Sequence, residues 1–195
     1  MVGFLMALLM ILLQGFSLLL PILISGISLI VCMRKGWLAR LDVPLDGGLI
    51  LGGQPLIGRS KSVRSLVLYL FIATFITWLL HVCAPLTDAI APVYRENPFI
   101  LGPATTLAYL AGEVLNSFVK RRLGISTSGS VTGPLARRTQ AIVDNVDGML
   151  ASGLVLIIGY SVATEVLAAS FVLAIVTHFS TDALMRRLGL KRKQR

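Results

Sequence analysis

Charged residues are scarce in this sequence, and acidic ones are the scarcest. Only 14% of the 195 residues are charged, whereas soluble globular proteins carry roughly 25%. Hydrophobic residues make up 55% of the chain, which is more apolar surface than a soluble fold of this length can cover. The same apolar richness excludes disordered and collagen-like chains. We therefore expect a single integral membrane domain over residues 1–195.

Cysteine and histidine are also rare, with two of each. Two cysteines cannot build a disulfide scaffold, and Cys32 and Cys83 are expected near opposite faces of the membrane, where they cannot pair. Neither histidine has a second imidazole nearby in sequence that would indicate a metal site. No GxxxxGK[ST] or GxGxxG motif is present, so the usual phosphate-loop and dinucleotide-binding folds are not indicated.

Long apolar runs predict helices that cross a lipid bilayer. A hydrocarbon core of about 30 Å needs roughly 20 apolar residues in a helix. Such runs occupy residues 4–33, 66–84, 99–119, 146–160 and 162–184. We predict an all-α fold, a polytopic membrane helical bundle with five transmembrane helices. Four spans with a re-entrant segment is the alternative, because the run at 146–160 is of marginal length.

The basic residues support this arrangement of spans. Six lie in the loop at 34–65, five in the loop at 120–143 and six in the tail at 186–195, so that seventeen of eighteen share one side. The positive-inside rule makes that side cytoplasmic, with the N-terminus outside and the C-terminus inside. These charges should attract anionic lipid headgroups. Trp37 is the single aromatic residue in these three segments, and the others lie almost entirely in the predicted spans, so nucleic-acid binding is not expected.

One polar helix face is predicted within the third span. Glu113, Asn116, Ser117 and Lys120 are spaced to lie on one side of a helix, with Glu113 inside the bilayer boundary. An acid at that depth is costly and usually functional. The face is either an intrahelical Glu–Lys pair with a snorkelling lysine or a metal-and-phosphate site that faces the bundle interior.

Two further features lie on the predicted cytoplasmic side. Asp144 and Asp147 share a face at the start of the fourth span, where they either favour the helix dipole or bind a divalent cation. The loop at 34–65 is rich in glycine and basic residues, which suits phosphate oxygens, although it could equally bind headgroups. Together these features predict phosphoryl or nucleotidyl transfer to a substrate with a phosphorylated head and a lipid tail.

Two motifs carry a resemblance to a known family. The first is Gly112-Glu113-x-x-x-Ser117-x-x-Lys120-Arg121-Arg122-Leu123-Gly124, followed by Asp144-x-x-Asp147. The second is Pro44-Leu45-Asp46-Gly47-Gly48, followed by Gly58-x-x-Lys61-Ser62-x-Arg64. Both resemble the CDP-archaeol synthases, relatives of the CDP-diacylglycerol synthases. Ser62 and Ser65 stand where the family usually has threonine and glycine, and the Arg of the diacylglycerol signature is replaced by Asn145.

The resemblance implies a Mg²⁺-dependent reaction at the cell membrane, with the active site facing the cytoplasm. CTP and a phosphorylated isoprenoid ether lipid, unsaturated archaetidic acid, would give the CDP-linked lipid and pyrophosphate. The implied metal ligands are Glu113, Asp144 and Asp147. The implied catalytic residues are Lys120, Arg121 and Ser117, and the implied nucleotide-binding residues are Asp46, Gly58, Lys61, Ser62 and Arg64.

Three alternative functions make different demands on the sequence. A phosphatidate cytidylyltransferase would use the same chemistry on an ester lipid. A CDP-alcohol phosphotransferase needs Asp-Gly-x-x-Ala-Arg, which the residues after Asp46-Gly47 do not supply. A small transporter would need polar residues along a path across the membrane, whereas Glu113 is the one acid well inside a predicted span.

Overall fold

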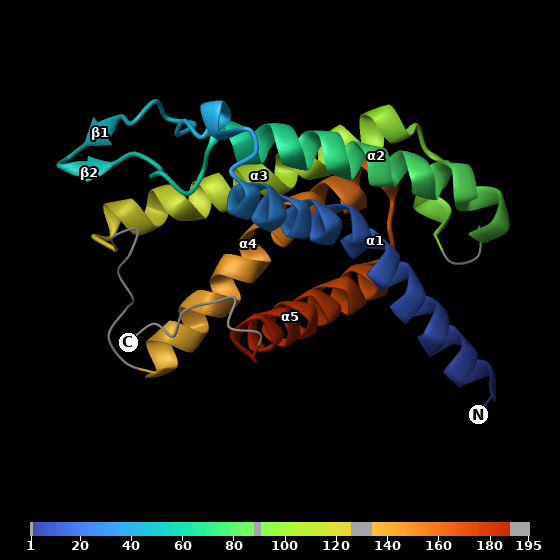
Figure 1. The fold of residues 1–195 in the computed structure, drawn as a ribbon. Coiled ribbons are helices and arrows are strands. Elements are labelled where there is room, and N and C mark those ends of the chain that lie inside the picture. Colours follow the sequence, from blue (N-terminus) through green and yellow to red (C-terminus); the bar gives the residue numbers. More distant parts are fainter. Residues whose placement is uncertain (1, 88–90, 126–133, 188–195) are drawn as a thin grey trace.

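The computed structural model describes residues 2–87, 91–125 and 134–187. Five α-helices make up most of this part of the chain: α1 (Val2–Lys35), α2 (Val63–Thr87), α3 (Pro98–Arg122), α4 (Pro134–Tyr160) and α5 (Thr164–Arg187). The shorter elements are the 3₁₀ helices η1 (Ala39–Leu41) and η2 (Pro92–Arg95) and the strands β1 (Ile50–Leu51) and β2 (Gln54–Pro55). The predicted helical bundle is confirmed (Figure 1).

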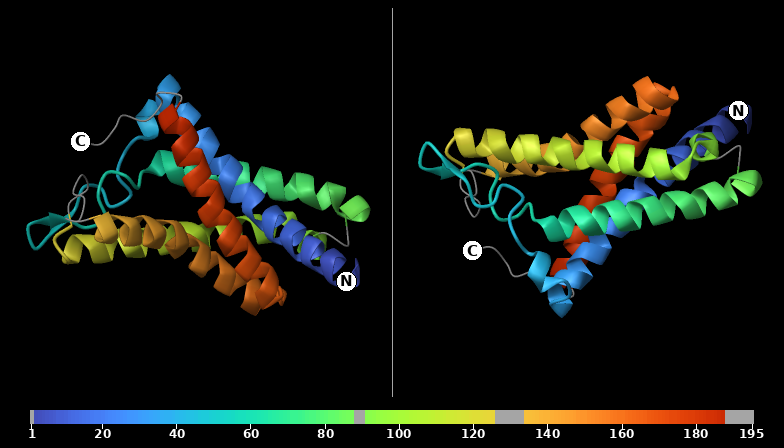
Figure 2. Two further views of the ribbon diagram at one scale, coloured as in Figure 1. Left: turned by 90° about the horizontal axis from the view of Figure 1, so that it is seen from below. Right: turned by 90° about the horizontal axis from the view of Figure 1, so that it is seen from above.

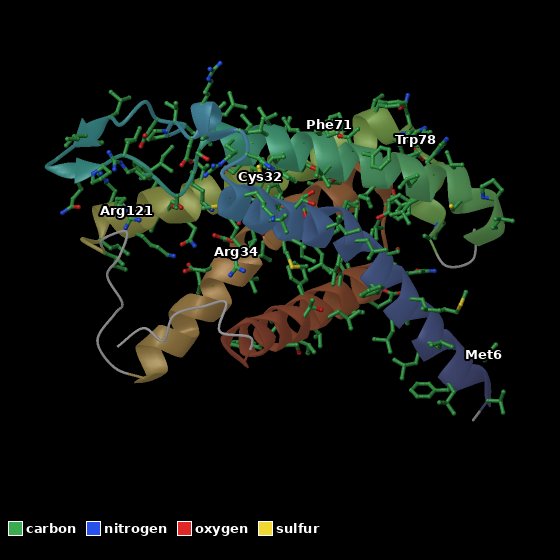
Figure 3. All side chains as sticks on the ribbon, viewed as in Figure 1. Met6, Cys32, Arg34, Phe71, Trp78 and Arg121 are labelled. Carbon is green, nitrogen blue, oxygen red and sulfur yellow. The ribbon has the colours of Figure 1, made fainter. Side chains whose placement is uncertain are left out.

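The helices have the lengths and surfaces of a membrane protein. In the described residues, α1, α2 and α3 are long and apolar enough to cross a bilayer, while α4 and α5 contain the shorter apolar stretches Val146–Tyr160 and Thr164–Thr177. Large apolar side chains face outward, and Phe71 is 73% exposed. Phe71 and Trp78 lie on the outer side of α2 (Figure 3). Such a surface suits contact with acyl chains; the count of five spans stays a prediction.

The connections between helices gather at two ends of the bundle. One end of the bundle holds the β1–β2 hairpin, the C-terminal end of α3 and the N-terminal end of α4 (Figure 1). The other end holds η2 and the α4–α5 connection. Helix α1 packs against α2 and α5, and α3 packs against α2 and α4. Figure 2 shows α3 and α4 running side by side near the hairpin end. The hairpin end therefore carries the segments predicted to face the cytoplasm.

The buried apolar cluster lies toward the end opposite the hairpin. It contains Ala84, Ala91, Tyr94, Leu101, Leu156 and Leu167. The Tyr94 hydroxyl donates to the backbone oxygen of Ser17 at 2.8 Å, and His81 Nδ1 lies 2.8 Å from the backbone oxygen of Tyr94. These contacts attach η2 to α1 and α2. Cys32 and Cys83 are both free thiols.

Two predicted loops contain regular structure. In the loop at 34–65, Ile50 pairs with Pro55 in a short antiparallel hairpin. Its turn is made by Gly52 and Gly53 at φ +59° and +76°, where glycine has no steric penalty. In the predicted loop at 120–143, α4 begins at Pro134. Proline is well tolerated in the first turn of a helix. Most of the predicted basic tail, residues 188–195, lies outside the described residues, as do residues 126–133.

Candidate functional site

A close approach of α3 and α4 organises the candidate site. A Cβ atom added to Gly112 would lie 2.4 Å from the backbone oxygen of Asp147. A Cβ atom added to Gly148 would lie 2.7 Å from the ring of Tyr109. Only glycine at these two positions allows the helices to come so near. The polar face of α3 is thereby set against the start of the apolar part of α4.

The two aspartates are joined by side chains from α3. Asn116 Nδ2 donates to Asp144 Oδ1 at 2.9 Å and to Asp147 Oδ2 at 2.7 Å. The Lys120 ammonium also donates to Asp144 Oδ1. Asp147 accepts a further hydrogen bond from the backbone N–H of Gly148 at 2.6 Å. The sequence predicts that Asn116 shares a helix face with Glu113 and Lys120. Its role as a bridge between the aspartates is not predictable from that spacing, because it depends on a second helix.

Glu113 forms its ion pair with Lys61 of the basic loop and not with Lys120 of its own helix. Lys61 Nζ lies 2.5 Å from Glu113 Oε2, and the two side chains are 19% and 18% exposed. Lys120, the intrahelical partner in one of the two interpretations, bonds to Asp144 instead. The interpretation of Glu113 and Lys120 as an intrahelical ion pair is therefore wrong. Glu113 and Lys61 are both close enough to act electrostatically on Asp147.

The three predicted metal ligands do not form one closed cluster. Within the residues the structure describes, no three His, Cys, Asp or Glu side chains surround a common cation position. Asp144 and Asp147 are held together, and Glu113 is held separately by Lys61. The ligand set of all three acids stays a prediction.

Asp46 organises the glycine-rich loop. Its carboxylate accepts hydrogen bonds from the backbone N–H groups of Gly48 (2.9 Å), Ile57 (2.8 Å) and Gly58 (3.2 Å). Desolvation raises the pKa of this carboxyl, but the backbone hydrogen bonds outweigh it, and the pKa is lowered from the usual 3.8. Asp46 and Gly58, both predicted to bind nucleotide, thus bond to each other in this conformation.

The start of α2 carries two more of the predicted nucleotide-binding residues, Ser62 and Arg64. Ser62 and Ser65 cap the helix reciprocally, since each hydroxyl accepts from the other residue's backbone N–H at 3.3 and 3.2 Å. The two serines that depart from the family pattern therefore make a helix cap. Arg64 is buried, and its guanidinium lies 3.0 Å from Asp42.

The basic end of α3 holds three differently placed residues. The Ser117 hydroxyl donates to the backbone oxygen of Glu113 at 2.8 Å. Arg121 is buried and bonds to the backbone oxygen of Ile125; it lies at the hairpin end of α3 (Figure 3). Arg122 donates to the backbone oxygens of Leu51 (2.6 Å) and Pro55 (3.1 Å), which fastens the hairpin to α3.

An apolar cavity of about 330 Å³ adjoins this polar cluster. Its lining includes Leu23 of α1, Met149 of α4 and Phe171 of α5. Tyr69 and Tyr109 also line it, with ring centroids 5.9 Å apart and planes 11° apart. The Tyr109 ring also lies against Gly148, the residue after Asp147. The tyrosine pair therefore stands between the acidic cluster and the cavity. Spacing along the chain cannot indicate this boundary, because the cavity is a space between helices.

Comparison with known proteins agrees with this architecture. The family model of the CarS-like CDP-archaeol synthases matches residues 7–194. A CDP-archaeol synthase of Aeropyrum pernix is 27% identical over 186 residues, which cover 92% of this chain and 90% of that protein. A solved structure of an intramembrane enzyme for archaeal membrane lipid biosynthesis matches with a TM-score of 0.64 and 22% identity, covering 88% of this chain and 94% of that one. This multi-pass membrane protein belongs to the CDP-archaeol synthase family.

Proposed function

We propose that this protein transfers a cytidylyl group from CTP to unsaturated archaetidic acid, giving CDP-archaeol and pyrophosphate. One observation carries the proposal beyond family membership: a cluster of acids and cations meets an apolar cavity at Tyr69 and Tyr109. A substrate with a charged head and apolar tails needs a polar and an apolar compartment in contact. A nucleotide needs only the polar one.

The reaction makes modest chemical demands on the protein. An oxygen of the lipid phosphate attacks the α-phosphorus of CTP. The bond from that phosphorus to the oxygen bridging the β-phosphate breaks, and its electron pair leaves with pyrophosphate. The lipid phosphate is already ionised at neutral pH, so no general base is required. The protein contributes positioning and neutralisation of phosphate charge.

The aspartate pair fits a magnesium ion. Mg²⁺ in proteins takes one or two carboxylates and fills its other positions with water and substrate phosphate oxygens. Asp144 and Asp147 are already bridged by one amide nitrogen at 2.9 and 2.7 Å, so their oxygens lie near a common point. We assign the ion to this pair, with Glu113 as a third carboxylate. When bound, it would neutralise charge on the phosphate oxygens.

The cations have a matching role. Lys61 and Lys120 each pair with an acid and are available to exchange that acid for a phosphate oxygen. Arg64 and Arg121 are buried, and the Nε atom of each has no hydrogen-bond partner within the described residues. A buried donor without a partner is costly, and a phosphate oxygen is a strong acceptor for it. The Ser117 hydroxyl has one proton, which it donates to the backbone oxygen of Glu113; we propose that it exchanges this acceptor for a phosphate oxygen.

We place the site on the cytoplasmic side of a five-span protein. The hairpin end carries the basic loop at 34–65 and the basic end of α3, and the positive-inside rule assigns such an end to the cytoplasm. CTP would reach the site from this side.

Incorporation of labelled CTP into lipid tests the proposal. Purified full-length protein in detergent is given CTP labelled in the cytosine ring, Mg²⁺, and either unsaturated archaetidic acid or phosphatidic acid. We expect label in the archaetidic acid product and its loss when EDTA is added. Preferential formation of a labelled CDP-linked lipid from phosphatidic acid would change the assigned lipid substrate. Absence of labelled lipid with both acids would refute cytidylyl transfer.

A further inference from the structure

We propose that Asn116 supplies an uncharged oxygen ligand to the cation assigned to Asp144 and Asp147. This inference rests on the proposed function, because it concerns the same cation site. Asn116 Nδ2 lies 2.9 Å from Asp144 Oδ1 and 2.7 Å from Asp147 Oδ2. The end of one neutral side chain on α3 thus faces two carboxylates of α4 at once.

The aspartates determine which end of the amide faces them. Carboxylate oxygens are acceptors, so an amide oxygen beside them would be repelled, whereas the NH₂ group can donate one proton to each. The Lys120 ammonium also donates to Asp144 Oδ1. The partial positive charge of the amide hydrogens and the full charge of the lysine therefore offset the repulsion between the two acids.

A divalent cation held by the aspartates reverses this preference of the amide. The cation repels the NH₂ group and attracts the amide oxygen, which is a ligand type that suits Mg²⁺. Half a turn about the Cβ–Cγ bond exchanges Oδ1 and Nδ2, and both orientations are accessible to asparagine. Because the amide is uncharged, it adds a ligand without reducing the positive charge that the ion offers to the CTP phosphates.

The packing of α3 against α4 keeps Asn116 beside the aspartates. Asn116 lies one turn after Gly112, on the same face of α3. A Cβ atom added to Gly112 would lie 2.4 Å from the backbone oxygen of Asp147, so the two helices are in contact at this level. Glu113, by contrast, pairs with Lys61 at 2.5 Å. Asn116 therefore reaches both aspartates without any change in helix packing.

A change from oxygen to sulfur at this position tests for direct contact with the cation. Asn116→Cys should favour Cd²⁺ over Mg²⁺, because thiolates prefer soft metals. The longer bond from metal to sulfur offsets the shorter side chain. Asn116→Ser is the matched control, since serine carries oxygen where cysteine carries sulfur. Cys32 and Cys83 are present in both variants, so their contributions cancel.

The readout is the cation concentration that gives half of the rise in unfolding temperature. Purified full-length protein is measured at fixed CTP and without lipid, so no turnover occurs. We expect the preference for Cd²⁺ over Mg²⁺ to be about tenfold greater in Asn116→Cys than in Asn116→Ser. Asn116→Leu is close in size but has no oxygen, and it should need about tenfold more Mg²⁺ than the wild type.

Three results would overturn the inference. A lower Mg²⁺ requirement in Asn116→Leu would mean that the amide competes with the cation for the aspartates. Equal metal preferences in the Cys and Ser variants would mean that Asn116 acts on the aspartates only as a hydrogen-bond donor. A lower unfolding temperature of Asn116→Leu without cation, together with an unchanged Mg²⁺ requirement, would mean a purely structural role.

The outcomes separate this inference from the proposed function. Wild-type protein that labels no lipid refutes the proposed function, whatever the variants do in the binding measurement. Wild-type protein that labels lipid, together with any of the three results above, refutes the inference alone. If Asn116→Leu cannot be purified, the comparison of the Cys and Ser variants decides the question without it.

Discussion

Replacing Gly112 with alanine should disrupt the site without touching any polar residue. The added Cβ would lie 2.4 Å from the backbone oxygen of Asp147, while ordinary van der Waals contact begins near 3.4 Å. Both the new atom and the oxygen belong to helix backbones and cannot rotate away. Helices α3 and α4 must therefore separate by about 1 Å at this point.

The consequence for the acids follows from their distances. Asn116 Nδ2 lies 2.7 Å from Asp147 and 2.9 Å from Asp144, so a separation of this size would stretch both bonds beyond hydrogen-bonding range. Overpacking of this kind costs about 1–3 kcal/mol, which the helix propensity of alanine offsets by about 1 kcal/mol. A misplacement of 1 Å in a catalytic site lowers turnover by about 100-fold. Gly112→Ala should thus reduce activity far more than stability.

The assay compares lipid labelling and unfolding temperature in two alanine variants. Gly159→Ala is the control, because it makes the same change within α4, where an added Cβ meets nothing within 4 Å. We expect Gly159→Ala to keep wild-type turnover and Gly112→Ala to lose about 100-fold. Wild-type turnover in Gly112→Ala would show that the contact between α3 and α4 does not set the site geometry.

Further predictions concern the charges. Lys61→Met should raise the KM for CTP, because it removes a cation proposed to bind the phosphates. It should also lower stability modestly, because half-buried Glu113 loses its ion-pair partner. Lys61→Arg should recover part of the loss in KM, and equal KM values in both variants would contradict this role of Lys61. Asp144→Asn and Asp147→Asn should each lower Mg²⁺-dependent turnover by about 100-fold, and near wild-type rates would remove the metal assignment. The lowered pKa of Asp46 means that its carboxylate stabilises the loop above pH 3.8 and that this contribution is lost as the pH falls through the folded-state pKa. Asp46→Asn should accelerate amide hydrogen exchange in the β1–β2 segment by about tenfold at pH 7, and unchanged exchange would contradict this account.

The helical bundle was predictable because apolar runs of membrane length have few alternatives. Backbone groups in lipid must bond within their own segment, so a run such as 66–84 becomes a helix regardless of its neighbours. The spacing of Glu113, Asn116 and Lys120 on one face followed from the period of the helix alone. The start of α4 at Pro134 was missed, because a charged segment outside the apolar run carries no comparable signal.

The partners of the site residues could not be predicted in the same way. An intrahelical pair of Lys120 with Glu113 was one of two interpretations of their spacing, but Lys120 bonds to Asp144 on another helix. Asp46 was assigned to the nucleotide, but it bonds to three backbone amides of its own loop. Several cations were available to each acid, and spacing along the chain does not rank contacts that form between helices.

Composition and spacing along the chain were enough to predict membrane helices, with Glu113, Asp144, Asp147 and most of the basic residues toward one side. These properties are local, since they depend on hydrophobicity over about 20 residues and on charge between the runs. The bridge that Asn116 makes between the aspartates, and the position of Tyr69 and Tyr109 between the acids and the apolar cavity, appear only once the helices are packed together. Those arrangements depend on how closely α3 and α4 approach at Gly112 and Gly148, and that distance is set by the packing of both helices together.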